Sequence, residues 1–199
     1  MRIVLATKND GKVREMAEIL SEFNIDVISQ KDADIDVDIE ETGATFMENA
    51  EIKARAVAML CDEPVLADDS GLCIDALGGK PGIFSARYGG EALPYKEKIR
   101  GILTELKNVT DREAHFECAM ALVFPDGKVI TATGRVNGRI LDAPRGEGGF
   151  GYDSIFYSNE LEKSFGEATD EEKNKVSHRG RALEGICEKL KMVQEGEEY

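Results

Sequence analysis

Short, mainly apolar runs mark the segments expected to form strands. Residues 2–6 and 64–66 have the composition of buried strands. Apolar and polar residues alternate over residues 116–124, a Pro-Asp-Gly turn follows, and residues 128–133 complete the pattern of a β-hairpin. Residues 155–157 are again strand-like. The pattern therefore predicts strands spread over most of the chain.

Helical periodicity fills several of the intervals between these strands. Apolar residues recur at helical spacing over residues 13–23 and 99–106. A capping box opens a further predicted helix over residues 45–61, and a second capping box lies at residues 169–172. A last helix is predicted around residues 182–190. Strands and helices thus alternate within one chain.

Residues 32–41 combine alternation with a high density of carboxylates. Asp and Glu alternate there with Ala33, Ile35, Val37 and Ile39. This pattern predicts an edge strand with a solvated acidic face. Only its end, residues 40–43, is a candidate for chemistry.

Composition limits the partners that the chain could bind. The net charge of −14 over 199 residues argues against nucleic acid or an anionic membrane, because both require a basic surface. Neither a membrane span nor a signal peptide is predicted. The four cysteines form no CxxC pair, which is typical of reduced thiols without structural zinc. We therefore expect one compact domain, in one or two lobes, in the cytoplasm.

The stretch most suited to chemistry is the acidic pair Asp68-Asp69, which follows the apolar run at 64–66 and precedes Ser70-Gly71. Two adjacent carboxylates at the end of a buried strand are costly to desolvate unless a metal, a cation or a substrate compensates them. If the strand continued through the pair, the two side chains would point to opposite faces and could take different tasks. A solvated acidic turn is the alternative.

The predicted helix over residues 45–61 carries two polar residues, Asn49 and Lys53, within its apolar arc. A lysine on the buried side of a helix requires an anionic partner. We expect Asp68-Asp69 or a bound phosphate to supply it. The alternative is a lysine whose ammonium group extends into solvent.

Thr7–Lys12 forms a polar turn between the first predicted strand and the first predicted helix. Free N–H groups and the positive end of the helix dipole attract anions at such a position, and Lys8 and Lys12 add charge. The segment is therefore a candidate phosphate-binding loop, although it lacks the Walker spacing. An ordinary strand-to-helix turn with surface lysines is the alternative.

Two segments nearer the C-terminus carry groups suited to a purine. Glycines surround the aromatic residues of Phe150-Gly151-Tyr152-Asp153, which permits a flat ring to stack close to the backbone. His178 and Arg179 lie where the last helix is predicted to begin, a position from which donors can be presented to a ligand. A helix cap with a surface cation is the alternative for this pair.

Together these motifs resemble the inosine triphosphate pyrophosphatase family. The resemblance covers nearly the whole chain, and its five separated motifs occur in the family's order. They are Thr7–Lys12; Glu40–Gly43 with Glu48-Asn49-Ala50 and Lys53; Ala67–Gly71; Phe150–Asp153; and Ser177–Gly180. The first motif departs from the commonest family pattern at Lys8 and Asp10, which leaves the role of Lys8 open.

The resemblance implies an α/β fold with a long mixed central β-sheet, flanking helices and two lobes around a deep nucleotide-binding cleft, all in one domain over residues 1–199. It also implies a homodimer. The implied reaction is magnesium-dependent hydrolysis of noncanonical purine nucleoside triphosphates (ITP, dITP, XTP) to the monophosphate and pyrophosphate. Such an enzyme cleanses the nucleotide pool and prevents incorporation of these nucleotides into DNA and RNA.

Hydrolysis at an α-phosphorus requires a hard cation, a carboxylate that holds it and orients water, and lysines that absorb the charge of the leaving pyrophosphate. In the family pattern Asp69 is the general base, although the sequence does not divide the roles between Asp69 and the adjacent Asp68. Lys53, which supplies charge together with Lys12 and Lys173, is the second expected catalytic residue. Glu40 and Asp69 are the expected ligands of Mg²⁺, with Asp68 as a further candidate. The expected substrate-binding residues are Thr7, Lys8, Asn9, Asp10, Gly11, Lys12, Ser70, Phe150, Gly151, Tyr152, Asp153, Lys173, His178 and Arg179.

Base choice is expected to depend on the 6-oxo group of inosine and xanthosine, an acceptor where adenosine carries an amino donor. Donors from Arg179 or backbone N–H groups would pair with the first and not with the second, which can discriminate by roughly 10⁴. Two other functions are alternatives. The His178-Arg179 pair argues against a pyrophosphatase for pyrimidine or modified nucleotides, and the acidic pair and Lys53 argue against a nucleotide sensor without turnover.

Overall fold

The computed structural model describes residues 1–195, which form five α-helices, eight strands and three short 3-10 helices. The helices are α1 (Asp10–Ser21), α2 (Phe46–Ala58), α3 (Tyr95–Glu105), α4 (Asp170–Val176) and α5 (His178–Glu195). The strands are β1 (Arg2–Leu5), β2 (Asp26–Ser29), β3 (Val65–Ile74), β4 (Lys80–Pro81), β5 (Glu113–Val123), β6 (Val129–Ile140), β7 (Phe156–Ser158) and β8 (Lys163–Ser164). The 3-10 helices are η1 (Asp75–Leu77), η2 (Gly82–Phe84) and η3 (Asp153–Ile155).

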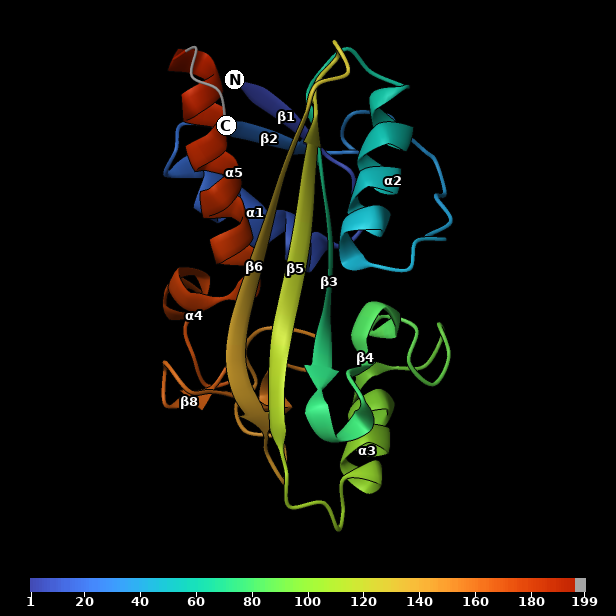
Figure 1. The fold of residues 1–199 in the computed structure, drawn as a ribbon, viewed down its shortest axis with the longest axis vertical. Helices are drawn as coiled ribbons and strands as arrows, with labels where there is room; N and C mark the ends of the chain where they lie inside the picture. Colours follow the sequence, from blue (N-terminus) through green and yellow to red (C-terminus); the bar gives the residue numbers. More distant parts are fainter. Residues whose placement is uncertain (196–199) are drawn as a thin grey trace. The chain divides into compact units, whose positions relative to one another are not determined.

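The strands pair in a mixed sheet. Their order is β2-β1-β3-β5-β6-β7-β8, and β4 pairs with β3. Strand β1 is parallel to β2 and β3, whereas β4, β7 and β8 pair antiparallel with their neighbours. Parallel neighbours need crossover connections, and α1 provides the one between β1 and β2 (Figure 1). The predicted α/β class with a mixed sheet and flanking helices is confirmed.

The chain divides into two compact units. The first contains Met1–Asp69, Cys118–Gly134 and the chain from Arg179 onward, and the second contains Ser70–Glu117 and Arg135–His178. The boundaries fall inside β3, β5 and β6 and after the first residue of α5. Each unit has its own hydrophobic core.

In the first unit, helices cover both faces of the strands. One layer contains α1 and α5 and the other contains α2, as Figure 1 shows. Because side chains alternate along a strand, Leu66 of β3 packs in the α1 and α5 layer, whereas its neighbour Ala67 packs in the α2 layer. Asp68 and Asp69 come next in this alternation.

The second unit has an aromatic core. Phe116 of β5 lies 4.7 Å from Phe156 of β7, and Phe156 lies 5.1 Å from Phe165, measured between ring centroids. Tyr152 is buried in the same core, and its hydroxyl donates to the Ser85 carbonyl at 2.8 Å. This anchor fixes the turn that carries Phe150 to Asp153.

Most local predictions are confirmed, and the ends of elements shift by a few residues. All four predicted helices are present, the second capping box opens α4, and the hairpin appears as β5 and β6. Both capping boxes are present, with Thr45 and Glu48 at α2 and with Thr169 and Glu172 at α4. No helix in residues 1–195 combines the length and apolarity that a membrane span requires.

Two strand predictions are wrong. Residues 32–41 form turns and irregular chain, and the strand of this region is β2 at Asp26–Ser29. Of the four apolar residues that alternate with the carboxylates, only Ile35 is buried, and the Gln30 amide donates to the carbonyls of Ile35 and Val37 at 3.3 and 3.4 Å. Strand β3 does not end at the acidic pair but continues to Ile74. Its pairing overrides the turn preference of Asp-Asp-Ser-Gly.

Candidate active site

Strand β3 gives Asp68 and Asp69 different partners within the first unit. The Asp68 carboxylate is 2.8 Å from the Lys12 ammonium, and a guanidinium nitrogen of Arg179 is 3.5 Å away. The Asp69 carboxylate accepts a hydrogen bond from the Asn49 amide at 3.0 Å, and the Lys53 ammonium lies 3.8 Å from its other oxygen. Asp68 thus meets residues of α1 and α5, and Asp69 meets residues of α2.

The environment of Asp68 favours its ionised form. Its side chain is fully buried, and burial alone would raise its pKa, but the charges of Lys12, Arg179 and Lys53 hold that pKa well below its ordinary value. The Arg179 guanidinium, also buried, forms a second ion pair with Glu15 of α1. A carboxylate held by two cations in this way is suited to fix those cations, not to exchange protons.

The pKa of Asp69 is shifted in the opposite direction from that of Asp68. Burial raises the pKa of Asp69, and the Lys53 charge and the Asn49 hydrogen bond offset the effect only in part. Its side chain is 8% exposed, whereas that of Asp68 is 0% exposed. The member of the pair with the higher proton affinity is therefore also the more accessible one, which favours Asp69 over Asp68 as a general base.

Lys53 joins Asp69 to a second carboxylate. Its ammonium is 2.5 Å from Glu41, and its side chain is only 14% exposed. Burial would lower the pKa of Lys53, but Asp68, Asp69 and Glu41 together raise it. Lys53 is therefore charged, and the expectation that the acidic pair supplies its partner is confirmed through Asp69.

Asn49 is a site residue that the sequence-based list of functional residues omits. Its side chain is completely buried, and its carbonyl oxygen accepts from the Gly43 N–H at 2.8 Å while its amide donates to Asp69. A Cβ at Gly43 would lie 2.7 Å from that oxygen, so only glycine fits. Asn49 therefore ties the turn at residues 40–43 to β3. Its position in the apolar arc of α2 was the available signal.

Two carboxylates, Glu15 and Glu41, are also absent from the list of expected site residues. Glu15 is recognisable from helical periodicity, because Lys12, Glu15 and Ile19 fall on one face of α1. Glu41 follows Glu40, the expected magnesium ligand, but the Glu40 side chain is exposed and it is Glu41 that contacts Lys53. The structure thus brings Glu41, not Glu40, to the Lys53 and Asp69 group.

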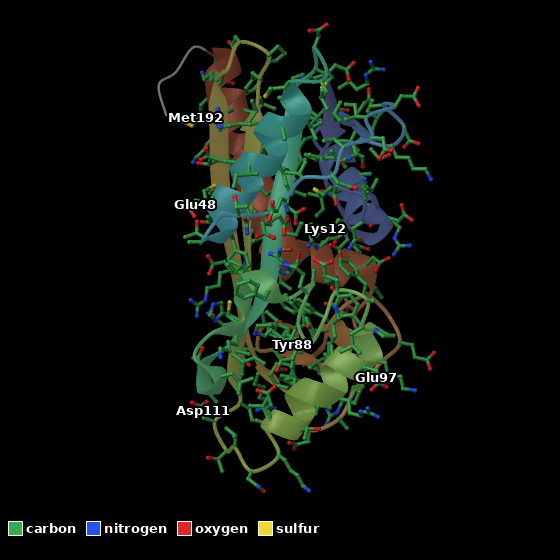
Figure 2. All side chains as sticks on the ribbon, turned by 90° about the vertical axis from the view of Figure 1, so that its right-hand side faces the viewer. Lys12, Glu48, Tyr88, Glu97, Asp111 and Met192 are labelled. Carbon is green, nitrogen blue, oxygen red and sulfur yellow. The ribbon has the colours of Figure 1, made fainter. Side chains whose placement is uncertain are left out.

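The Thr7–Lys12 loop is ordered by its own polar side chains. Asn9 caps α1 by accepting from the N–H groups of Gly11 and Lys12 at 2.9 and 3.2 Å, and Thr7 accepts from the Asn9 N–H at 3.2 Å. Lys12, labelled in Figure 2, comes from the first turn of α1 and pairs with Asp68. Because the cap uses these N–H groups, the group by which the first turn of α1 can attract an anion is the Lys12 ammonium.

Lys8 has a different environment from Lys12. Its ammonium pairs with Asp38 at 2.6 Å and Asp36 at 3.3 Å, and all three side chains are exposed. A cavity of about 380 Å³ also opens beside the loop in the first unit. It is lined by Thr7, Lys8, Asp10, Val13, Ser29, Gln30, Lys31, Asp34, Ile35 and Asp36. Lys8 and Asp10 thus face this cavity, whereas Lys12 turns to Asp68.

The second unit contains a separate polar group at Phe150–Asp153. The buried Asp153 carboxylate accepts from the Phe150 N–H at 2.8 Å and from the Lys173 ammonium at 2.7 Å. The same ammonium lies 4.7 Å from the Phe150 ring centroid. A Cβ at Gly149 would overlap the Asp153 carboxylate. This turn is therefore held in one shape with the half-buried Phe150 ring at its edge.

His178 and Arg179, adjacent in sequence, have unrelated surroundings. The His178 ring is buried in the second unit and stacks on Phe116 with centroids 4.8 Å apart and planes 12° apart. Arg179 belongs to the first unit, where Glu15 and Asp68 hold its guanidinium. The alternative of a surface cation is wrong for Arg179. Its observed partners are carboxylates, and its contact with the 6-oxo group stays a prediction.

The donor set fits a metal that arrives with a polyphosphate. In residues 1–195, no three His, Cys, Asp or Glu side chains converge as a metal site. Asp69 and Glu41 do share one cation, the Lys53 ammonium. Magnesium is commonly held by one or two carboxylates, with water and substrate phosphates completing the shell. Asp69 and Glu41 therefore suit a magnesium ion whose other ligands are water and substrate phosphates. They do not suit a site made of protein ligands alone.

Residues 3–189 match the Ham1 family. A dITP/XTP pyrophosphatase of Halalkalibacterium halodurans is 50% identical over 185 residues, covering 92% of this chain and 95% of the relative. One of Bacillus subtilis is 47% identical over 189 residues, covering 94% and 96%.

The chain is also similar to solved structures of Ham1 proteins. The Ham1 protein of Staphylococcus aureus matches with a TM-score of 0.86 at 40% identity, covering 97% of this chain and 100% of that chain. A HAM1 protein of Coxiella burnetii also matches with a TM-score of 0.86, at 43% identity, covering 96% and 98%. These matches agree with the resemblance drawn from the five motifs.

Proposed function

Because the chain belongs to the Ham1 family, we propose that it hydrolyses noncanonical purine nucleoside triphosphates (ITP, dITP and XTP) to the monophosphate and pyrophosphate. The names of the relatives at 47–50% identity support this substrate class. The structural observation that carries the proposal is the contrast between Asp68, whose fully buried carboxylate is held by Lys12 and Arg179, and Asp69, whose more accessible carboxylate is held by Asn49 and Lys53. Hydrolysis of a polyphosphate requires a group that activates water and cations that stabilise phosphate charge, and this arrangement gives the first task to Asp69 and leaves Asp68 to hold two cations.

In this reaction Asp69 accepts a proton from the attacking water. Asn49 fixes the orientation of the Asp69 carboxylate, and Lys53 limits the rise of its pKa. A base held by buried partners needs no reorganisation when the water attacks. Asp68 takes no part in proton transfer and instead holds Lys12 and Arg179.

The lysines of the first unit bind the polyphosphate. An ammonium group has three donors, so Lys12 can keep its bond to Asp68 while it donates to a phosphate oxygen at the N-terminus of α1. Lys53 adds a second cation beside Asp69. Magnesium, which Asp69 and Glu41 would hold, would neutralise phosphate charge and stabilise the leaving pyrophosphate.

The base-recognition role is assigned to the turn in the second unit. Phe150 offers a ring for stacking, and the Lys173 ammonium, which has three donors, can keep its bond to Asp153 while it donates to a purine edge. Arg179 and backbone N–H groups both stay assigned as donors to the 6-oxo group, and the two carboxylates that hold Arg179 favour the backbone groups.

Magnesium dependence, a homodimer and a cytoplasmic location, where nucleotides are used for DNA and RNA synthesis, are parts of the same proposal. Titration with Mg²⁺ after treatment with EDTA tests the first, and sedimentation equilibrium tests the second. Activity that persists in EDTA would contradict the magnesium dependence. A monomer at micromolar concentration would contradict the homodimer.

A substrate panel tests the function. We expect kcat/KM for ITP, dITP and XTP to exceed that for ATP by roughly 10⁴ if the site donates to the 6-oxo group. Equal values for ITP and ATP would contradict the proposed substrate class. A preference for dUTP over dITP would favour the alternative of a pyrimidine pyrophosphatase.

A further inference from the structure

Tyr95 is an accessible aromatic residue beside the Phe150–Asp153 turn. It is the first residue of α3, the helix that carries the labelled Glu97 in Figure 2, and it is 37% exposed. The other large aromatic side chains near this turn, Tyr152, Phe156 and Phe165, are buried in the core of the second unit. An exposed ring beside the turn assigned to a purine is therefore a candidate for contact with the base.

Two buried side chains hold the Tyr95 ring in place. The Tyr152 ring meets it edge-on, with centroids 5.3 Å apart and planes 83° apart, and the Lys98 ammonium lies 5.2 Å from its centroid. Both side chains are anchored to the main chain. Tyr152 donates to the Ser85 carbonyl at 2.8 Å, and Lys98 donates to the Ala86 carbonyl. A ring fixed in this way loses little conformational entropy when a ligand contacts it.

The glycine of the turn brings the backbone against Tyr95. A Cβ at Gly151 would lie 3.5 Å from Cε1 and 3.8 Å from Cζ of Tyr95, so this edge of the ring borders the turn. Gly151 has φ 65°, a left-handed conformation that favours glycine. Burial, together with the charge of Asp153, raises the pKa of the Tyr95 hydroxyl, so the ring is neutral at physiological pH.

We propose that Tyr95 is a specificity-determining residue whose ring contacts the purine base of the substrate. This inference rests on the proposed function and concerns a residue outside the five motifs. A fused two-ring base presents more area to a fixed aromatic surface than a pyrimidine does. Tyr95 therefore favours purines as a class and does not distinguish inosine from guanosine.

The test compares Tyr95→Ala and Tyr95→Phe with dITP and dUTP as substrates. We expect Tyr95→Ala to raise KM for dITP about 10-fold, because loss of base stacking is typically a factor of this order, with kcat little changed. The kcat/KM for dUTP should stay near the wild-type value. Tyr95→Phe should resemble the wild type, because the ring and not the hydroxyl makes the contact.

Tyr157→Ala is the matched control. Tyr157 belongs to the same unit and also has a cation over its ring, the Arg139 guanidinium at 4.4 Å from the centroid. We expect its truncation to leave KM for dITP unchanged. An unchanged KM for dITP in Tyr95→Ala, or equal losses for dITP and dUTP, would overturn the assignment of Tyr95.

Calorimetric titration with dIMP separates this inference from the proposed function. If the wild type binds dIMP but does not hydrolyse dITP, the proposed function is contradicted. The affinities of the wild type and Tyr95→Ala for dIMP can still be compared in that case. Tyr95→Ala should then weaken dIMP binding about 10-fold. Equal affinity of Tyr95→Ala and the wild type for dIMP, whether tight or negligible, would overturn the inference.

Discussion

Asp68 and Asp69 differ in environment although they are adjacent in sequence. Strand alternation turns Asp68 toward Lys12 and Arg179, and Asp69 toward Asn49 and Lys53. Lys12 and Arg179 contribute to lowering the pKa of Asp68. Asn49 and Lys53 do not outweigh the effect of burial, which raises the pKa of Asp69. The assignment of Asp69 as base and of Asp68 as a fixed anion follows from this difference.

Asp69→Asn should abolish turnover and preserve the fold. The change keeps the shape of the side chain and its contact with Asn49, but it removes the charge needed to accept a proton and to hold a metal. We expect kcat to fall by at least ~10³ and the unfolding transition to remain cooperative. Steady-state kinetics with saturating magnesium measures the effect, with Asp62→Asn, at an exposed position, as the control. A near-normal kcat for Asp69→Asn would exclude Asp69 as the base.

Arg179 offers a test between two roles. A base-recognition residue would alter the preference between ITP and ATP, whereas a residue that holds Asp68 and Glu15 would affect all nucleotides alike. For Arg179→Lys we expect an equal fall in kcat/KM for ITP, XTP, GTP and ATP. We also expect a loss of about 2 kcal/mol in the free energy of unfolding, because lysine cannot make both contacts of a planar guanidinium.

Kinetics with the four nucleotides and urea denaturation measure these two quantities. Arg14→Lys, on the exposed side of α1, is the matched control and should change neither. A selective loss for ITP with unchanged stability would restore base recognition to Arg179.

At the scale of elements, the positions of Asp68 and Asp69 depend on the course of β3. It continues through Asp68-Asp69-Ser70-Gly71 because Gly71 allows a close approach of the chain at η2. A Cβ at Gly71 would overlap the Gly82 carbonyl oxygen and lie 2.5 Å from the Ser85 hydroxyl, which itself accepts from the Leu72 N–H at 2.9 Å.

Gly71→Ala should therefore destabilise the protein by about 2 kcal/mol, since overpacking against backbone cannot be relieved by a rotamer change. Thermal and urea denaturation measure the loss. Gly101→Ala on α3 is the control, because a Cβ there meets only Tyr88 at 3.8 Å, and alanine favours a helix. An equal response of the two variants would show that the close approach at Gly71 does not matter.

The helices were predictable because their signals are local. Both capping boxes lie within four consecutive residues, and the apolar periodicity of α1, α2 and α5 is carried by the helices themselves. The course of β3 through an acidic pair was not predictable in this way. It depends on pairing with strands distant in sequence, which local preference for a turn at Asp-Asp-Ser-Gly does not reveal.

The same division between local and distant signals applies to the site. Lys53 and Asn49 stood out because they interrupt an apolar arc, and the structure shows their contact with Asp69. The pairing of Glu15 with Arg179 joins residues 164 positions apart in the sequence, and periodicity alone indicates only that Glu15 faces inward. The sequence therefore identified functional residues that carry a local signal, but it did not identify the contacts that join segments distant in the sequence.

At the scale of the whole molecule, a chain with net charge −14 gathers cations at two places. The first unit holds Lys12, Lys53 and Arg179 against carboxylates, and the second holds Lys173 against Asp153. Each of these cations is buried or nearly so. In the first unit their carboxylate partners, Glu15, Glu41, Asp68 and Asp69, outnumber them, so binding of an anionic triphosphate there would also call for a divalent cation.

The central claim is that water attacks the α-phosphorus of a noncanonical purine nucleoside triphosphate, and hydrolysis of dITP in ¹⁸O-labelled water tests it most directly. Mass spectrometry of the products shows both which bond breaks and which phosphorus gains the oxygen. We predict labelled dIMP and unlabelled pyrophosphate from the wild type, and no labelled product from Asp69→Asn. Label in the pyrophosphate, or stepwise release of orthophosphate, would contradict the account.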